Sequence, residues 1–224
     1  MMQNGIDQVA LIRMFSEASA KQGEAVRQAV NQATLKALQG RELTLKNIKQ
    51  VLGTVTKAAS AGAAGSPLGS VDVEALLAKA FAGMDGALEQ AVEANRRALQ
   101  QMVEQGVSLR ETQLKKALGE IEKMEDALLA TVRKAAAAGA DAQAQGPWAG
   151  VLQSMQGKGT ATGAQASAAV EQLMEDAQKR MRDGRALGLR ASQAMLDSYA
   201  TLVSGVLIGM SDALKQAPGG SRKR

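Results

Sequence analysis

Cysteine and histidine are both absent from this sequence of 224 residues. Without cysteine, the chain can form neither a disulfide nor a thiolate metal site. Without histidine, it lacks the commonest metal ligand and the only side chain that titrates near neutrality when unperturbed. Ser-His-Asp and Cys-His catalytic arrangements are therefore excluded. We expect a protein that is not an enzyme and that binds no metal or cofactor.

Aromatic residues and prolines are scarce, with one Trp, one Tyr, two Phe and three Pro. Hydrophobic residues still make up 46% of the chain, and many of them are alanines. Alanine is the best helix former because its side chain loses no entropy on folding, and few prolines are present to interrupt a helix. These features predict an all-α fold, an elongated bundle with coiled-coil-like hairpins and one long C-terminal helix.

The start of the chain lacks a basic flank followed by an apolar core of signal-peptide length, so we expect a cytoplasmic protein. The net charge of +5 permits an anionic partner without requiring one. Sequence-specific binding to nucleic acid is not expected, because aromatic side chains that could stack on bases are nearly absent.

Apolar residues recur three and four apart along most of the chain, which is the period of a helix face. In the first 64 residues one helix is predicted from about Ile6 to Gln39, and another from Thr44 to a loop at 60–70. The breaks in the period predict five parts: an N-terminal helical pair (1–64), an antiparallel helical hairpin (65–139), a Gly/Ala/Gln-rich linker in which a short helix can form (140–163), a long C-terminal helix (164–217) and a basic tail (218–224).

Polar residues mark several helix starts. Thr44 and Ser70 stand at N-cap positions, where a hydroxyl can accept a free backbone N–H. Ser108 and Glu111 have the spacing of a capping box at the start of the second hairpin helix. Asn95 lies on or beside the heptad seam of the first hairpin helix. On the seam it would specify register, as a lone polar residue does in coiled coils, but we favour a position at the edge.

The linker holds Trp148, the single tryptophan, which we expect to dock the linker onto the bundle. Its "GKGTATG" stretch, residues 157–163, lacks the spacing of a phosphate-binding loop and is predicted to be a flexible linker. Two pairs of adjacent carboxylates, Glu125–Asp126 and Glu175–Asp176, lie among Lys and Arg residues. Adjacent side chains of a helix point apart, so we expect these pairs to lie on solvated helix faces.

The last predicted helix contains an uncharged apolar run from Ser198 to Ser211. A membrane span needs about 20 apolar residues, so this shorter run is not expected to be a transmembrane helix. Because the run is apolar almost all round, it must be covered on more than one side. Either the bundle and a second subunit cover it, which we favour, or a hydrophobic surface does.

Three sets of residues in this helix are candidate contacts. Glycines four apart allow another helix to approach closely, which predicts a self-association or surface face. Its members are Gly184, Gly188, Met195, Leu202, Gly205 and Gly209. Candidate contacts to a hydrophobic surface are Tyr199, Val203, Val206, Leu207 and Met210. Candidate contacts to an anion are Arg182, Arg185 and Arg190.

The segment "LEQAVEANRRALQQM", with "EANRRAL" inside an Ala/Gln-rich amphipathic helix, resembles phasins, the proteins that coat bacterial polyhydroxyalkanoate storage granules. The resemblance covers about Val71 to Ala138. It implies a non-enzymatic protein whose helices cover the polyester with apolar faces, while charged faces keep the granules dispersed. Two other stretches, "GRELTLKNIKQVL" and "KKALGEIEKMEDALLATVRKAA", resemble an uncharacterised family of bacterial helical proteins.

Two functional hypotheses follow. The first is a phasin-like protein that self-associates and adsorbs to a polyester granule or a related lipid surface. The second is a structural or regulatory cytoplasmic bundle that forms homo-oligomers through the Gly/Met-rich helix face.

Overall fold

The computed structural model describes residues 2–3, 6–17, 23–39, 43–65, 70–104, 111–138, 148–155, 159–182, 203 and 206. This part of the chain confirms the all-α fold, since helices dominate it and the strands are only two residues long. The elements in chain order are β1 (Met2–Gln3), β2 (Ile6–Asp7), α1 (Gln8–Glu17), α2 (Gly23–Leu38), α3 (Leu45–Ala64), α4 (Ser70–Glu104), α5 (Glu111–Ala138), α6 (Trp148–Met155) and α7 (Ala161–Arg182). The two strands pair in an antiparallel manner, with Met2 opposite Asp7.

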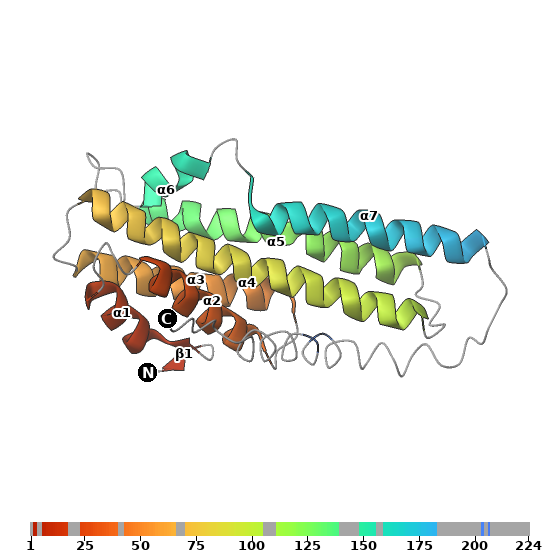
Figure 1. The fold of residues 1–224 in the computed structure, drawn as a ribbon, viewed down its shortest axis with the longest axis horizontal. Helices are drawn as coiled ribbons and strands as arrows, with labels where there is room; N and C mark the ends of the chain where they lie inside the picture. Colours follow the sequence, from red (N-terminus) through yellow and green to blue (C-terminus); the bar gives the residue numbers. More distant parts are fainter. Residues whose placement is uncertain are drawn as a thin grey trace, which may run out of the picture.

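The helices pack in layers around α4 and α5, the two longest (Figure 1). These two run in opposite directions through the middle of the molecule. α6 and α7 pack against both of them, while α2 packs along α4 and α3 packs along α5. α1 lies against α3. The arrangement leaves α7 as an outer helix that covers the α4–α5 layer.

The sequence predicted a single helix from Ile6 to Gln39, and this prediction is wrong. The structure has β2 at Ile6–Asp7, then α1, and starts a separate helix, α2, at Gly23. α1 and α2 pack mainly against different helices, α3 and α4 respectively. The apolar period continues through both helices, and for this reason the sequence pattern did not reveal the break.

The loop predicted at 60–70 begins later than expected, because α3 continues to Ala64. Its start agrees with the sequence, since the Thr44 hydroxyl accepts the backbone N–H of Asn47 at 3.3 Å. At the other end small residues allow a close helix crossing, and a β-carbon on Gly62 would lie 2.7 Å from the carbonyl oxygen of Ile12 in α1. The run of Ala, Gly and Ser thus serves helix packing rather than a turn.

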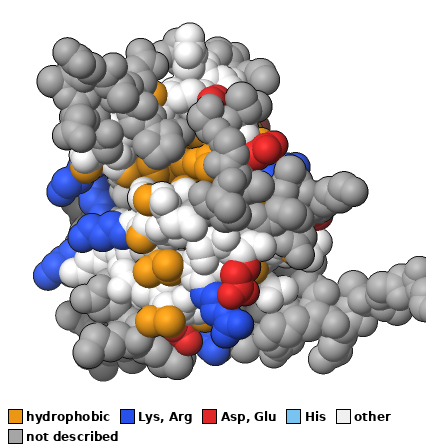
Figure 2. Space-filling view, turned by 90° about the vertical axis from the view of Figure 1, so that its left-hand side faces the viewer, with side chains coloured by type: hydrophobic (Ala, Val, Ile, Leu, Met, Phe, Trp, Pro, Cys, Tyr) orange, Lys and Arg blue, Asp and Glu red, His pale blue; other side chains and the backbone are white. Residues whose placement is uncertain are grey.

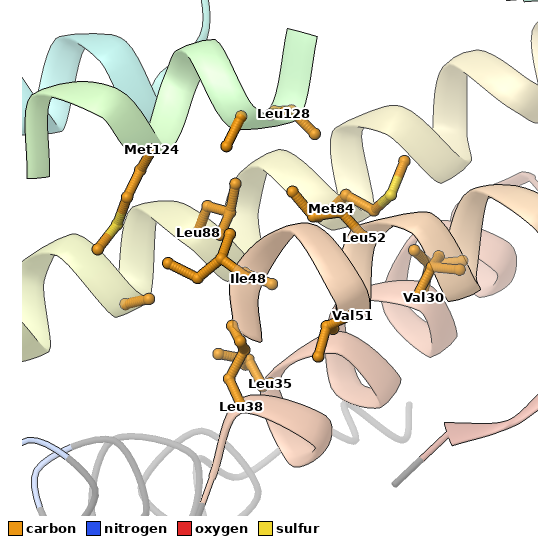
Figure 3. Close-up of a cluster of buried hydrophobic side chains, with 14 of the residues drawn as sticks. Val30, Leu35, Leu38, Ile48, Val51, Leu52, Met84, Leu88, Met124 and Leu128 are labelled. Atoms are coloured by element: carbon orange, nitrogen blue, oxygen red, sulfur yellow. The ribbon is translucent and has the colours of Figure 1, made fainter. Parts of the chain in front are cut away.

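The core is one continuous cluster in which α2, α3, α4 and α5 all take part. Figure 3 shows Ile48 and Leu52 of α3 beside Leu88 and Met84 of α4. Asn95 is only 3% exposed, and its side-chain amide donates to the carbonyl oxygen of Ala91 at 3.1 Å. The predicted edge position is therefore wrong. The side-chain amide can be buried because it has a hydrogen-bond partner within its own helix.

Ser70, the predicted N-cap, is the first residue of α4. The capping box predicted for α5 is not described, because Ser108 lies outside the described residues. Among the helices that the structure describes, none is both long enough and apolar enough to cross a membrane.

Candidate functional site at the start of α7

The first turn of α7 is held by Asp85, a carboxylate of α4 that is 8% exposed. The two oxygens of Asp85 accept the backbone N–H groups of Ala161 at 2.8 Å and of Thr162 at 2.9 Å. The Thr162 hydroxyl also donates to the Asp85 carboxylate at 2.6 Å. The first N–H groups of a helix have no partner within the helix, and here a carboxylate from another helix accepts two of them.

A second carboxylate reaches the same turn from α5. The Thr160 hydroxyl accepts the backbone N–H of Gly163 at 2.9 Å, as an N-cap does, and donates to Glu125 at 2.6 Å. A β-carbon on Gly163 would collide with the Glu125 carboxylate. Glycine at this position therefore allows the carboxylate of α5 to lie against the start of α7.

The start of α6 repeats this arrangement. Gly150 is the third residue of α6, as Gly163 is of α7. A β-carbon on Gly150 would collide with the carboxylate of Glu74 in α4. Each helix thus begins beside a carboxylate of the α4–α5 layer, and a negative charge is favourable at the positive end of a helix dipole. We call α6 and α7 together the arm.

Trp148 anchors α6, as the sequence predicts. Its side chain is fully buried, and its indole N–H donates to the hydroxyl of Ser60 in α3 at 2.8 Å. The bond satisfies the only polar group of the ring, so the large aromatic surface can be buried at the end of the bundle.

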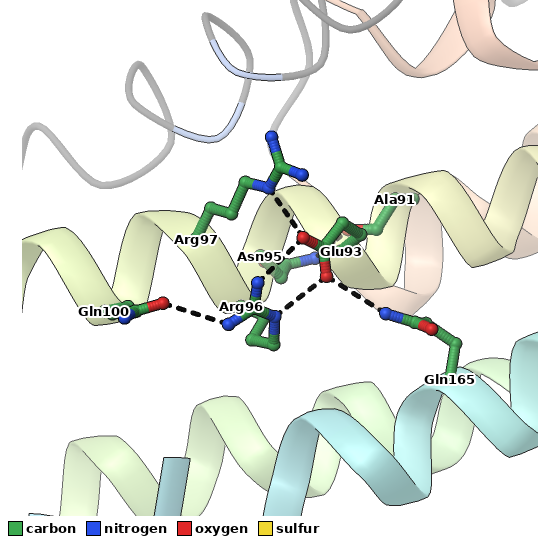
Figure 4. A network of polar contacts seen from close by, with 7 residues as sticks. All are labelled: Ala91, Glu93, Asn95, Arg96, Arg97, Gln100 and Gln165. Carbon is green, nitrogen blue, oxygen red and sulfur yellow. Dashed lines mark hydrogen bonds and ion pairs between the residues drawn. The ribbon is translucent and has the colours of Figure 1, made fainter. Parts of the chain in front are cut away.

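Further along α7, Gln165 joins an ionic network on α4 (Figure 4). Its amide donates to the Glu93 carboxylate at 3.0 Å. Arg96 donates to both oxygens of Glu93 at 2.8 Å, and Arg97 donates to one of them at 2.6 Å. The hydrogen bonds from Arg96, followed by those from Arg97, lower the pKa of Glu93 from 4.5 to about 2. Glu93 therefore stays ionised at neutral pH.

The face that α7 buries consists mainly of small side chains. Thr162, Ala166 and Ala169 are buried, and Leu173 is the one large buried side chain among residues 161–176, the part of α7 whose side chains the structure describes. Met174 of α7 lies outside this face, since it is 49% exposed. α7 thus packs closely against α4 and α5 but buries little apolar area for its length.

Few of the contact residues predicted from the sequence fall in the described part of the chain. Val203 is 2% exposed and belongs to the core, and Val206 is partly buried against it. Both therefore contact the bundle in this structure, and their contact with an external surface stays a prediction. Arg182 is the last residue of α7, with its side chain outside the description. The described part of the predicted C-terminal helix ends at Arg182, apart from Val203 and Val206. The predicted residues that lie outside the described residues are Gly184, Arg185, Gly188, Arg190, Met195, Tyr199, Leu202, Gly205, Leu207, Gly209 and Met210.

Sequence reasoning missed the residues that hold the arm. The expected flexible linker at 157–163 is wrong from Thr160 onward, because Thr160 caps α7 and the helix begins at Ala161. The two threonines were a usable signal, since a hydroxyl before an Ala-rich stretch is typical of a helix start. Glu125 does not simply lie on a solvated face, but only tertiary structure could show that it meets Thr160.

Within the described residues, no three His, Cys, Asp or Glu side chains are grouped as a metal site would require. The arrangement is one of helix attachment by hydrogen bonds and small-residue packing. Residues 1–216 match the model of a family of unknown function, DUF6781. No curated protein and no solved structure matches the chain.

Proposed function

We propose that this chain, which belongs to the family of unknown function DUF6781, is a non-enzymatic amphipathic helical protein that coats a hydrophobic storage granule such as a polyhydroxyalkanoate particle. The observation that carries the proposal is the small-residue face of α7, which covers the α4–α5 layer with Thr162, Ala166 and Ala169. We suppose that α7 detaches and that the hydrophobic surface then contacts the face of α4 and α5 that α7 had covered.

The proposal includes an opening step because the described part of the closed bundle offers little apolar surface. Among the described side chains, the large hydrophobic ones that are exposed are Val9 and Met174. A polyester particle therefore needs access to faces that are buried in the closed form. The amphipathic helices α4 and α5 then lie on the particle with their charged faces toward water.

The small size of the buried α7 side chains keeps the cost of opening low. Burial of one methyl or methylene group contributes about 0.8 kcal/mol, whereas a leucine side chain contributes about 1.5–3 kcal/mol. Alanines therefore hold α7 less strongly than leucines would, and the hydrogen bonds of Asp85 and Glu125 supply much of its specificity. This balance favours a helix that is positioned accurately and released readily.

The test is co-sedimentation of purified protein with amorphous polyhydroxybutyrate particles, with neutral liposomes alongside. We expect selective pelleting with the polyester at micromolar protein, and a red shift of the Trp148 fluorescence if α6 is released with α7. Protein that leaves the particles bare would refute the proposal.

A closed variant tests the role of the arm. Because the chain has no cysteine, Glu93→Cys and Gln165→Cys place the only two thiols at positions whose side chains are 3.0 Å apart in the structure. A short bifunctional maleimide then ties α7 to α4. We expect the cross-linked protein to bind polyester far less than the same variant before cross-linking. Equal binding by both forms would show that α7 does not need to leave.

A second candidate function is homo-oligomerisation through the Gly/Met-rich face. The specific observation in its favour is Met174 of α7, a large apolar side chain that is 49% exposed and that a second copy of the chain would cover. Gly205→Leu and Gly209→Leu are then expected to shift an oligomer toward monomer. Unchanged mass in light scattering for both variants would refute this alternative.

A further inference from the structure

The exposed side of α3 carries lysines from its start to Lys57. Lys46, Lys49 and Lys57 are all exposed, and α3 contains no acidic residue. The chain has no Asp or Glu anywhere from 43 to 71. Lysines on a helix surface usually alternate with carboxylates three or four residues away, which neutralise them. On α3 this neutralisation is missing.

The last turns of α5 continue the basic region. Arg133 and Lys134 are exposed, and α5 has no acidic residue after Asp126. α3 and α5 pack against each other. Two neighbouring helices therefore contribute positive charge, α3 through its lysines and α5 through its last turns.

The register of the two helices brings the last basic residue of α3 to the same end of the bundle as the basic residues of α5. Figure 3 shows that Ile48 and Leu52 of α3 follow one another in the same direction as Met124 and Leu128 of α5. The two helices are therefore parallel. Both pairs are four residues apart, so extending each helix by a little over one turn places Lys57 of α3 near the level of Arg133 and Lys134 of α5.

We call Lys46, Lys49, Lys57, Arg133 and Lys134 the basic face. In the described part of the chain, the ion pairs are formed by Arg13, Arg27, Arg96 and Arg97, and none of them includes a residue of the basic face. Figure 2 looks at the end of the molecule where α3 and α5 finish, and shows Lys and Arg side chains gathered along one edge.

Small exposed side chains follow the last charges toward the ends of both helices. Ala61 and Ala64 of α3 are exposed, as are Ala137 and Ala138 of α5. Alanine adds no bulk and is weakly apolar, so the helices can approach a flat surface while the long lysine stems extend toward its charges.

We infer that the basic face binds the surface of an anionic phospholipid membrane or monolayer. Nucleic acid is the less suitable partner, because the aromatic side chains of the described residues, Phe15, Phe81 and Trp148, are buried and cannot stack on bases. Lipid headgroups need only a broad field of positive charge at short range, which the basic face supplies.

This binding is separate from the polyester coating, because the basic face is exposed while α7 remains in place. The cross-linked Glu93→Cys/Gln165→Cys protein is therefore expected to bind anionic vesicles as well as its untreated form does. If the cross-linked protein binds vesicles but not polyester, the two kinds of binding use different surfaces. The vesicle proposal and the polyester proposal can therefore be refuted independently.

The test is co-sedimentation with vesicles of phosphatidylcholine that contain phosphatidylglycerol, and with vesicles of phosphatidylcholine alone. The test variant is Lys46→Gln/Lys57→Gln/Lys134→Gln, and the matched control is Lys36→Gln/Lys79→Gln/Lys123→Gln. Both remove three exposed lysines, so both have the same net charge. Lys123 lies among Glu120, Glu122 and Asp126, which makes it a stringent control. Helix content by circular dichroism confirms that both variants fold.

We expect the original chain to bind only the anionic vesicles, and to lose binding at high salt. The test variant should bind anionic vesicles at least about tenfold more weakly. Each lysine near an anionic surface contributes favourably to the binding free energy, and this variant removes three of them from the basic face. The control should change by less than about threefold. Equal losses in both variants, no loss in the test variant, or tighter lysine-dependent binding to duplex DNA than to vesicles would each overturn the inference.

Discussion

A β-carbon on Gly83 of α4 would lie 2.5 Å from the carbonyl oxygen of Arg27 in α2. The two helices are therefore in near-contact at their backbones. The same hypothetical atom would lie 2.9 Å from the β-carbon of Val30, so the site has no room for a methyl group on either side. α2 is held to the central layer by this approach and not by large interlocking side chains alone.

Gly83→Ala should separate α2 from α4 and destabilise the fold by about 1–3 kcal/mol, the usual cost of overpacking a core. The matched control is Gly53→Ala in α3, where an added β-carbon meets nothing within 4 Å. That variant should be more stable by about 0.5–1 kcal/mol, because alanine favours a helix interior over glycine. Urea unfolding of both variants measures the difference. Similar midpoints for the two would show that the close approach does not occur.

The threonine at the start of α7 gives a second prediction. Thr162→Val keeps the shape of the side chain but removes the hydroxyl that donates to Asp85 at 2.6 Å. A buried carboxylate that loses a partner costs about 1–3 kcal/mol. We expect faster amide hydrogen exchange in α7 with little change in α2 and α3, because the loss is local to the arm.

Thr131→Val in α5 is the control for this substitution. Its hydroxyl bonds only to the carbonyl oxygen of Ala127 within the same helix, at 2.7 Å. The change should leave exchange in α7 as it is. If both variants loosen α7 equally, the effect comes from valine in a helix and not from the attachment to Asp85.

The sequence was sufficient for the helices with a clear apolar period. α4 begins at Ser70, one residue before the predicted start at Val71, and Thr44 caps α3 as predicted. These features depend on residues close together in the chain, and so local physical rules identify them. The break between α1 and α2 depends instead on which helix each one packs against, which no local pattern encodes.

The attachment of the arm could be anticipated only in part. Trp148 was identifiable because a single tryptophan in a chain poor in aromatics has a large surface to bury. The roles of Asp85 and Glu125 were not, because each carboxylate meets a helix start far away in the sequence. In sequence they are ordinary acidic residues of charged helices, and only the folded arrangement distinguishes them.

Trp148→Phe tests how far α6 depends on its polar contact. The substitution keeps most of the buried aromatic area and removes the N–H that donates to Ser60 at 2.8 Å. Stability should fall by about 1–2 kcal/mol, from the lost volume and the lost hydrogen bond. Combining it with Ser60→Ala should cost less than the sum of the two single changes, because both remove the same bond. Strict additivity in unfolding experiments would contradict this contact.

Glu93 gives the clearest dependence on pH. Its pKa is about 2 in the folded chain against an ordinary value of 4.5, because Arg96 and then Arg97 donate to its carboxylate. A group with a depressed folded pKa stabilises the fold above its unfolded pKa, and this contribution is lost as the pH falls toward the folded value. Glu93→Gln should therefore lower stability by about 1–2 kcal/mol at pH 7. The difference from the original chain should shrink between about pH 4.5 and about pH 2.

Urea unfolding at several pH values measures this difference, with Glu89→Gln on the same helix as the control for loss of one carboxylate from α4. Amide exchange at the Gln165 end of α7 separates two consequences of the change, because Gln165 bonds to Glu93 directly at 3.0 Å. If α7 loosens together with the loss of stability, the network helps to hold the arm on the bundle. A difference from the original chain that stays constant across the acidic range would mean that Glu93 is not held ionised by its arginines, and the pH argument would fail.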